Sequence, residues 1–301
     1  MSRGAALVLA FDCCILLIFI CRNLLTYLRS LCQVLPFDLN VKFHKLTAYS
    51  LLIFTILHVN GHYVNFYTIQ TNNLLFEAIG LNAWQLHYQT WAGITGHLML
   101  LIMFLMFTSS TKQTRNVNHE IFSGIHVLSF FFFISLFLHS RGCFVKNAAG
   151  ICKGYNSNYF TIPAFAIYIS EMIIRLYRSM KPTTLKNCAW HSDTQLELVI
   201  EKKSFTFRSG QYLTVKVPAI SWFEAHPFTV SSCSEDEFIT IHVGVVGNWT
   251  RSLSTLLRSS NVYPRIIIDG PYGAPSQDLD MFKVSVLICA GLGNSSYNFQ
   301  E

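Results

Sequence analysis

The chain has 301 residues, of which 51% are hydrophobic and only 13% charged, and its formal net charge is +6. This balance is typical of membrane proteins, and the basic residues form no stripe with interleaved aromatics, so we expect membrane lipid and no nucleic acid as a partner. The nine cysteines include no CxxC or other metal-ligand spacing, which argues against cysteine-based metal chemistry.

Apolar blocks dominate the first 180 residues, whereas residues 181–285 alternate apolar and polar positions like a soluble β-rich domain. The first run could be a signal peptide, but it is long for one and no small-residue cleavage site follows it. We therefore expect an α-helical transmembrane bundle of about five spans, at residues 4–28, 43–66, 91–108, 121–138 and 160–174.

Two of these runs carry a histidine near either end. His44 and His58 are 14 residues apart, and His126 and His139 are 13 apart. At about 1.5 Å per residue, each spacing covers about 20 Å of a membrane core that is about 30 Å thick. Two such helices side by side would offer one pair of imidazoles near each membrane face, as a six-coordinate haem iron requires. The sequence therefore predicts two b-type haems, with these four histidines as iron ligands.

The two spacings do not fit a pair of regular helices equally well. At about 100° per residue, 14 steps nearly return to the same helix face, whereas 13 steps miss it by about 140°. We therefore expect either that the helix carrying His126 and His139 is locally irregular, or that the two side chains reach their partners differently.

Basic residues set the expected orientation. They gather in segments 29–45, 112–115 and 175–186, which the positive-inside rule places in the cytosol. The β-rich half is then cytosolic, His44 and His126 form the inner pair, and His58 and His139 form the outer pair. Cys143 and Cys152 fall in an outer loop, either as a disulfide or as two free thiols.

Two further residues fall near the outer pair. His62 lies one helical turn beyond His58 on the same face, either above the outer haem or simply at the water interface. Arg3, at the outer end of the first run, adds a positive charge there or is an ordinary helix terminus. His97 and His119 have no partner at matching depth, and we interpret them as structural.

Five or six short strands are expected after residue 182, five of them at 196–201, 210–218, 226–232, 238–246 and 265–270. The Gly and Pro residues in the turns between them are typical of an antiparallel β-barrel. Residues 287–294, LICAGLGN, read as a buried strand entering a Gly-rich turn, like the start of a nucleotide-binding βαβ unit.

Several separated motifs together resemble one family, the superoxide-generating NADPH oxidases with their ferric reductase relatives. The motifs cover nearly the whole chain in order: SRGAALVL, CRNLLTYLR, FHKLTAY, LHVNGHYVNFY, WAGITGHLMLL, the His126 and His139 pair with GCFV behind it, RLYR, GQYL, HPFT, VGNWT and DGPYGAP. SRGAA, YVNFY and DGPYGAP favour the oxidases over the reductases.

The resemblance implies a transmembrane haem domain at 1–180, a ferredoxin-reductase-like FAD domain at 181–285 and the start of an NADPH domain at 286–301. It implies two haem b, FAD and NADPH as cofactors, dioxygen as the acceptor, superoxide as the product and regulatory subunits as partners. Arg3 and His62 would border the dioxygen site. The flavin would be lined by His226, Pro227, Phe228 and Thr229. The expected location is the plasma membrane or another cell membrane, with the FAD domain cytosolic.

Three departures from the family pattern bear on function. The chain starts where the family's second transmembrane helix would. Gly244 and Asn248 stand where the family usually has a basic and an acidic residue. The chain also stops at AGLGNSSYNFQE, where the family continues with a full NADPH domain, so we expect truncation at both ends and an incomplete NADPH site. Two alternatives remain: a metalloreductase acting on ferric or cupric chelates, and a non-catalytic haem membrane subunit.

Overall fold

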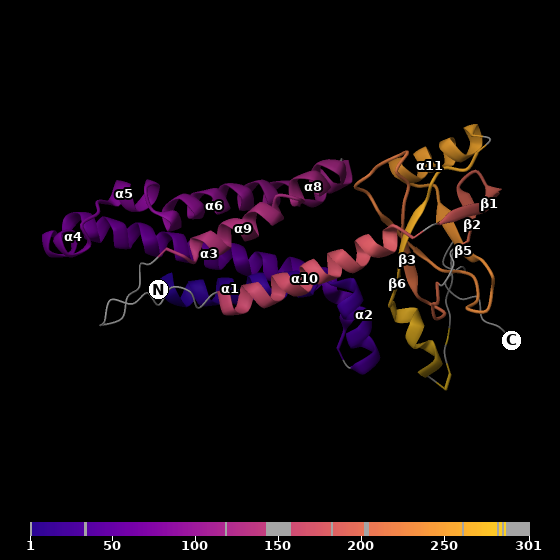
Figure 1. The fold of residues 1–301 in the computed structure, drawn as a ribbon, viewed down its shortest axis with the longest axis horizontal. Coiled ribbons are helices and arrows are strands. Elements are labelled where there is room, and N and C mark those ends of the chain that lie inside the picture. The colour runs from indigo at the N-terminus through magenta and orange to yellow at the C-terminus, as the bar shows by residue number, and fades with distance from the viewer. Residues whose placement is uncertain are drawn as a thin grey trace. The chain divides into compact units, whose positions relative to one another are not determined.

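The computed structural model describes residues 2–32, 35–117, 119–142, 158–181, 183–201, 205–260, 262–281, 283–284 and 286 (Figure 1). The chain forms two compact units. The first comprises Met1–Ile20 and Val41–Tyr168, and the second comprises Cys21–Asn40 and Ile169–Glu301. The cysteine pair Cys143 and Cys152 and the strand expected at 287–294 lie outside the described residues.

The first unit is helical. Its helices are α1 (Ser2–Ile18), α3 (Asn40–Thr71), α4 (Asn73–Ile79), α5 (Ala83–Tyr88), α6 (Trp91–Ser109), α7 (Lys112–Val117), α8 (His119–His126), α9 (Ser129–His139) and the part of α10 (Asn158–Ser179) up to Tyr168. Three of these helices have an N-cap side chain at their first turn. The side-chain oxygens of Asn72, Asn82 and Thr90 accept hydrogen bonds from backbone amides in the first turns of α4, α5 and α6. These caps let two short helices join α3 to α6.

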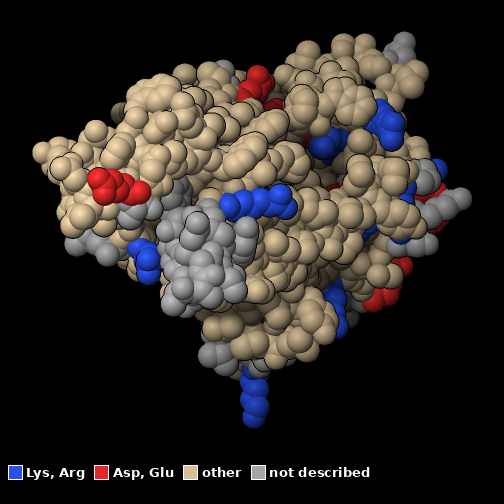
Figure 2. All heavy atoms as spheres, turned by 60° about the vertical axis from the view of Figure 1, so that its left-hand side comes forward, with Lys and Arg blue, Asp and Glu red and all other residues tan. Residues whose placement is uncertain are grey.

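The core of the first unit is a cluster of buried side chains from five helices: Cys13, Leu17, Leu51, Met103, Phe133 and Ala164. Around it, many large apolar side chains are exposed, among them Ile53, Phe104 and Phe131. Figure 2 shows a face on which uncharged side chains predominate and charges are sparse. Exposed apolar patches of this extent would be unfavourable in water, so the outer surface of these helices is suited to lipid.

Among the residues that the structure describes, three helical segments are long and apolar enough to cross a membrane: α6, the segment His119–His139 formed by α8 and α9, and α10. A fourth candidate is the pair of α1 and α2 (Arg22–Leu31), which is bent by 85°. The expected span at 43–66 falls within α3, which does not meet this test, because its histidines and asparagines lower its mean hydropathy. Membrane insertion of α3 therefore stays a prediction.

The expectation of one continuous helix over 4–28 is wrong. α1 ends at Ile18 and α2 begins at Arg22. The reason lies in composition: α1 is mostly apolar, with Arg3 and Asp12 as its charged residues, whereas α2 places Arg22, Thr26 and Arg29 three to four residues apart on one face. A helix with such a polar face is favoured where it can satisfy its charges, and Arg29 pairs with both Asp38 and Asp278.

The irregularity expected between His126 and His139 is confirmed. α8 ends at His126 and α9 begins at Ser129. In between, the amides of Val127 and Leu128 bond to carbonyls three residues earlier, at 3.3 and 2.9 Å, instead of four. Such 3₁₀-type bonds turn the chain by about 120° per residue instead of 100°, which shifts the helical phase between the two histidines.

The second unit contains α2, the short 3₁₀ helix η1 (Phe37–Leu39), the part of α10 from Ile169, six strands, α11 (Asn248–Ser259) and η3 (Pro275–Met281). The strands are β1 (Thr184–Ser192), β2 (Gln195–Glu201), β3 (Tyr212–Lys216), β4 (His226–Thr229), β5 (Ile239–Gly244) and β6 (Ile267–Tyr272). All five expected strands are present; β1 and α11 were not predicted.

The strands form two antiparallel three-stranded sheets, in the orders β1-β2-β5 and β4-β3-β6. An isolated bridge between Val230 and Ile241 links them. Over the described residues the barrel expected from the sequence is therefore not closed. Leu196, Leu198 and Ile200 alternate along β2 and are fully buried, so one face of that strand supplies the core and the other faces outward.

Candidate functional site

The structure brings the four predicted ligand histidines together as two pairs in the first unit. The ring centroids of His44, on α3, and His126, at the end of α8, are 6.4 Å apart. Those of His58, on α3, and His139, at the end of α9, are 6.3 Å apart. Each pair therefore joins α3 to one end of the broken helix, as the sequence predicts.

Hydrogen-bond partners fix the protonation of three of these rings. The Nδ1 atom of His44 lies 3.2 Å from the carbonyl oxygen of Leu16, and that of His58 lies 3.0 Å from the carbonyl oxygen of Ser2. A carbonyl oxygen can only accept, so both Nδ1 atoms carry the proton. The lone pair of each neutral ring is then on Nε2.

His139 also carries its proton on Nδ1, because of a hydrogen bond to a hydroxyl group. Its Nδ1 atom lies 3.1 Å from Oγ1 of Thr95, whose own proton is donated to the carbonyl oxygen of Trp91 at 2.5 Å. The hydroxyl has one proton and it is already used, so Thr95 accepts from Nδ1 of His139. Its Nε2 is therefore also unprotonated and has a lone pair available for a metal ion. Hydrogen-bond partners such as Thr95 orient metal-binding histidines.

The spacing of each pair fits a shared metal ion. With metal–nitrogen bonds of about 2 Å and about 1.1 Å from nitrogen to ring centre, two axial imidazoles have centroids about 6 Å apart. The observed 6.3 and 6.4 Å agree with this value. The residues present therefore fit two six-coordinate haem irons.

The four histidine rings differ in their hydrogen-bond partners and in the space around them. Nδ1 of His126 is buried and has no hydrogen-bond partner among the described residues, so this ring lacks the orienting partner of the other three. At the other pair, a Cβ on Gly96 would lie 3.3 Å from Cε1 of His139. The glycine thus leaves room for that ring on α6.

His62 lies beside the second pair, as expected. Its ring centroid is 4.5 Å from that of His58 and 5.7 Å from that of Phe66. Arg3 is exposed and directly follows Ser2, whose carbonyl holds His58. The N-terminus of α1 approaches α3 at Gly61, where a Cβ would lie 3.0 Å from Cβ of Ser2.

Sequence reasoning missed an aromatic cluster next to His62. The ring of His87, on α5, is 4.7 Å from Phe66 and 5.4 Å from His97. Nδ1 of His97 lies 2.7 Å from the carbonyl oxygen of Gly93, which agrees with the structural role expected for it. The only available signal was the run of polar aromatics in LHYQTWAGITGH, whose contacts depend on the turn between α5 and α6.

The predicted flavin residues form β4 in the second unit, an edge strand of its sheet. The ring of His226 stacks on that of Trp249, with centroids 4.3 Å apart, and Thr229 pairs with Tyr212 across the strands. The HPFT and VGNWT motifs therefore meet in space. The indole N–H of Trp249 is buried without a hydrogen-bond partner among the described residues, so a bound group could accept from it. Pro227 is exposed and Phe228 contacts the core.

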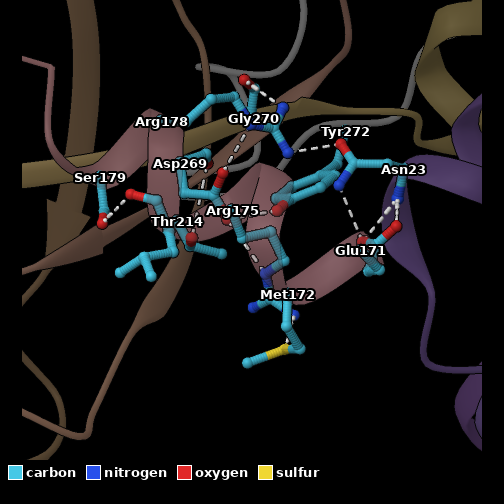
Figure 3. A network of polar contacts seen from close by, with 11 residues as sticks. Asn23, Glu171, Met172, Arg175, Arg178, Ser179, Thr214, Asp269, Gly270 and Tyr272 are labelled. Carbon is cyan, nitrogen blue, oxygen red and sulfur yellow. Dashed lines mark hydrogen bonds and ion pairs between the residues drawn. The ribbon is translucent and has the colours of Figure 1, made fainter. Parts of the chain in front are cut away.

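A polar network connects α10 to β6 within the second unit (Figure 3). Asp269 pairs with the Nε atoms of Arg175 and Arg178, at 3.2 and 3.0 Å, and accepts from the hydroxyl of Tyr272. Burial, reinforced by Asp269, raises the pKa of Tyr272, so its hydroxyl stays protonated and able to donate. Arg178 also donates to the carbonyl oxygen of Gly270 at 2.8 Å. These residues lie in the RLYR and DGPYGAP motifs, whose partnership the sequence alone does not reveal.

A pocket of about 270 Å³ lies beside this network. Its lining includes two arginines, Arg22 and Arg29, together with Tyr212 of β3 and residues Gly273, Ala274 and Pro275 after β6. Tyr212 is the strand partner of Thr229, so the pocket adjoins the predicted flavin strand. Asp38 also lines the pocket and pairs with Arg29, so the lining holds both basic and acidic side chains.

Comparison with known proteins identifies the fold of both units. Residues 6–137 match the family model for the ferric reductase like transmembrane component, and residues 178–276 match that for an FAD-binding domain. The superoxide-generating NADPH oxidase heavy chain subunits B and A of Dictyostelium discoideum are 34% and 35% identical over 99% and 97% of this chain. The chain is therefore similar to NADPH oxidases along almost its whole length. The resemblance stated from the motifs is thus confirmed.

The two matched domain models indicate an integral membrane protein with an FAD-binding domain. NADPH oxidase 1 of Mus musculus is also similar, 29% identical over 97% of this chain. The chain spans 47%, 60% and 60% of the lengths of the two Dictyostelium subunits B and A and the mouse protein. These relatives are therefore longer than the sequence described.

Proposed function

We propose that this chain carries electrons across a membrane from NADPH, through FAD and two b-type haems, to dioxygen, producing superoxide. The observation that carries the proposal is that the four histidines form two pairs. In each pair, the ring centroids have the spacing expected of two ligands on one iron. Relatives named as superoxide-generating oxidases support the choice of reaction. Bound haem and FAD would supply the one-electron and two-electron redox chemistry that side chains cannot.

His44 and His126 would hold the inner haem, and His58 and His139 the outer haem. The 14 residues between His44 and His58 correspond to about 21 Å along continuous α3, so the two sites lie at different depths. Two histidines at each iron leave no open position, which suits electron transfer rather than binding of oxygen at the metal.

His62 and Arg3 would border the dioxygen site. His62 stacks edge-on against His58 and closes one side of the outer pair. Arg3 would place a positive charge where an anionic product forms, which favours its formation. On the other side of the membrane, His226 to Thr229 of β4 would line the flavin. The network around Asp269 holds β6 on the far side of β3 in the same sheet.

The orientation completes the proposal. The basic segments favour a cytosolic FAD domain, in the plasma membrane or another cell membrane, with the second pair on the outer side. The domain limits at residues 180 and 285, the use of NADPH and the regulatory subunits stay predictions.

The test uses membranes from cells expressing the full chain. Haem is counted per polypeptide, and reduced-minus-oxidised spectra are recorded after dithionite and after NADPH. We expect two b-type haems in the wild type, one after His58→Ala, and two after His97→Ala, because His97 bonds to a backbone carbonyl outside both pairs. Absence of b-type haem from the wild type would refute the ligand assignment. Reduction by dithionite but not by NADPH would refute the electron input and leave the ligand assignment standing.

A further inference from the structure

Three potential metal ligands gather on the β1-β2-β5 sheet, on strands other than the predicted flavin strand β4. They are His191 on β1, Glu197 on β2 and His242 on β5, and one ligand atom from each lies within 4.8 Å of the others. Glu197 and His242 are direct partners across the strands, and His191 lies two positions beyond Ala189, the other strand partner of Glu197.

The three side chains occupy the outward face of the sheet, opposite the buried leucines of β2. The side chains of Glu197 and His242 are each 24% exposed and that of His191 is 50% exposed. The cluster is therefore anchored by the strands yet open to solvent on one side. A metal ion there could keep a water molecule as an additional ligand.

The hydrogen bonds of His242 show that its Nε2 is unprotonated and has a lone pair available for a metal ion. Nδ1 of His242 lies 2.8 Å from Oγ of Ser231, and that hydroxyl gives its proton to the carbonyl oxygen of Thr240 at 3.0 Å. Ser231 therefore accepts from Nδ1 of His242, and the lone pair of the neutral ring is on Nε2.

That lone pair faces a carboxylate across a gap. Nε2 of His242 lies 4.0 Å from Oε2 of Glu197, whereas Nε2 of His191 is only 2.6 Å from the same oxygen. Two electron-rich atoms facing each other at 4.0 Å are stabilised when a cation lies between them. Tetrahedral zinc needs donor atoms about 3.3 Å apart, between these two distances, so small side-chain rotations would complete the site.

We propose that His191, Glu197 and His242 bind a zinc ion, with water as the fourth ligand. Two imidazoles and one carboxylate form a donor set that zinc accepts, and Ser231 is the hydrogen-bond partner that orients one imidazole. The site lies in the FAD-binding domain but shares no residue with the flavin strand. It is independent of the proposed electron path.

The test measures metal binding by the full chain purified in detergent. Equilibrium dialysis gives the zinc stoichiometry and dissociation constant, and Co²⁺ substitution gives the visible absorption bands of a tetrahedral site. We expect Glu197→Gln to remove one zinc ion per chain and the Co²⁺ bands. Ser231→Ala keeps all three ligands and should weaken binding about tenfold or more, as loss of an orienting partner does.

The matched control is Glu201→Gln. Glu201 lies on the same strand and the same face as Glu197 but pairs with Lys186 at 2.6 Å. Its replacement should leave zinc stoichiometry and affinity unchanged. Zinc binding that is equal in the wild type and in Glu197→Gln would overturn the proposal, and the three residues would then be a hydrogen-bonded cluster. Flavin absorbance of each variant verifies that the domain is folded.

Discussion

Replacing Asp269 by asparagine should destabilise the FAD-binding domain strongly. Asp269 is 9% exposed and faces the guanidinium groups of Arg175 and Arg178 while accepting from Tyr272. Asparagine keeps the size of the side chain but removes its negative charge. Two arginines are then left close together without the carboxylate that neutralises them.

The magnitude follows from the burial of the three side chains. Removing one partner of a buried ion pair costs about 3–5 kcal/mol. The side chains of Arg175, Arg178 and Asp269 are 25%, 17% and 12% exposed, so we expect the lower end, about 3 kcal/mol. For a domain of about 100 residues, that loss lowers Tm by about 12–24 °C.

The assay is thermal unfolding of the full chain in detergent, followed by the fluorescence of released FAD. Asp193→Asn is the matched control, because Asp193 is 97% exposed and its 3.2 Å pair with Arg258 is a surface pair that contributes little. Combining Asp269→Asn with Arg178→Gln should recover part of the loss, since one uncompensated charge is removed. Equal Tm values for Asp269→Asn and the Asp193 control would show that the network is not stabilising.

Two further variants probe the units separately. Gly96→Val should displace the ring of His139, which already lies 3.3 Å from the position of a Cβ, and should lower the haem count from two toward one; Gly124→Ala, with open space around it, is its control. An unchanged count in Gly96→Val would contradict the role of that space. Ile241→Ala, at a fully buried position of β5, should cost about 2–5 kcal/mol and lower the Tm of flavin release. The haem spectrum of this second variant should not change, and a loss of haem there would contradict the assignment of Ile241 to the core of the FAD domain alone.

Patterns with a regular period were predictable from the sequence. Leu196, Leu198 and Ile200 recur at every second position, with Glu197 and Glu201 on the other face, and the expected strand over 196–201 matches β2 within one residue. Strand β1 was missed because its sequence does not alternate apolar and polar residues. It is a strand because it pairs with β2 along its whole length. Helix α11 was not predicted, although Trp249, Leu253 and Leu257 recur every four residues, the spacing of an amphipathic helix.

Contacts between distant backbone and side-chain groups were not predictable. The carbonyls of Ser2 and Leu16 fix the protonation of two histidines, yet any residue at those positions would supply the same carbonyl. Likewise, the sequence shows that Arg175 and Asp269 exist but not that they meet, since 94 residues separate them. Such partnerships depend on how helices and strands pack, which local composition does not encode.

The break between α8 and α9 shows how chemistry can predict an irregularity in the fold. If His126 and His139 must both face α3, then 13 residues of regular helix cannot connect them, because they leave the second ring about 140° away. His44 and His58, at 14 residues, need no such correction, and α3 is continuous. The 3₁₀-type bonds of Val127 and Leu128 therefore lie on the one of the two helices whose spacing demands them. A regular helix over 119–139 would have separated one of the two pairs, so the irregular turn supports the pairing of all four histidines.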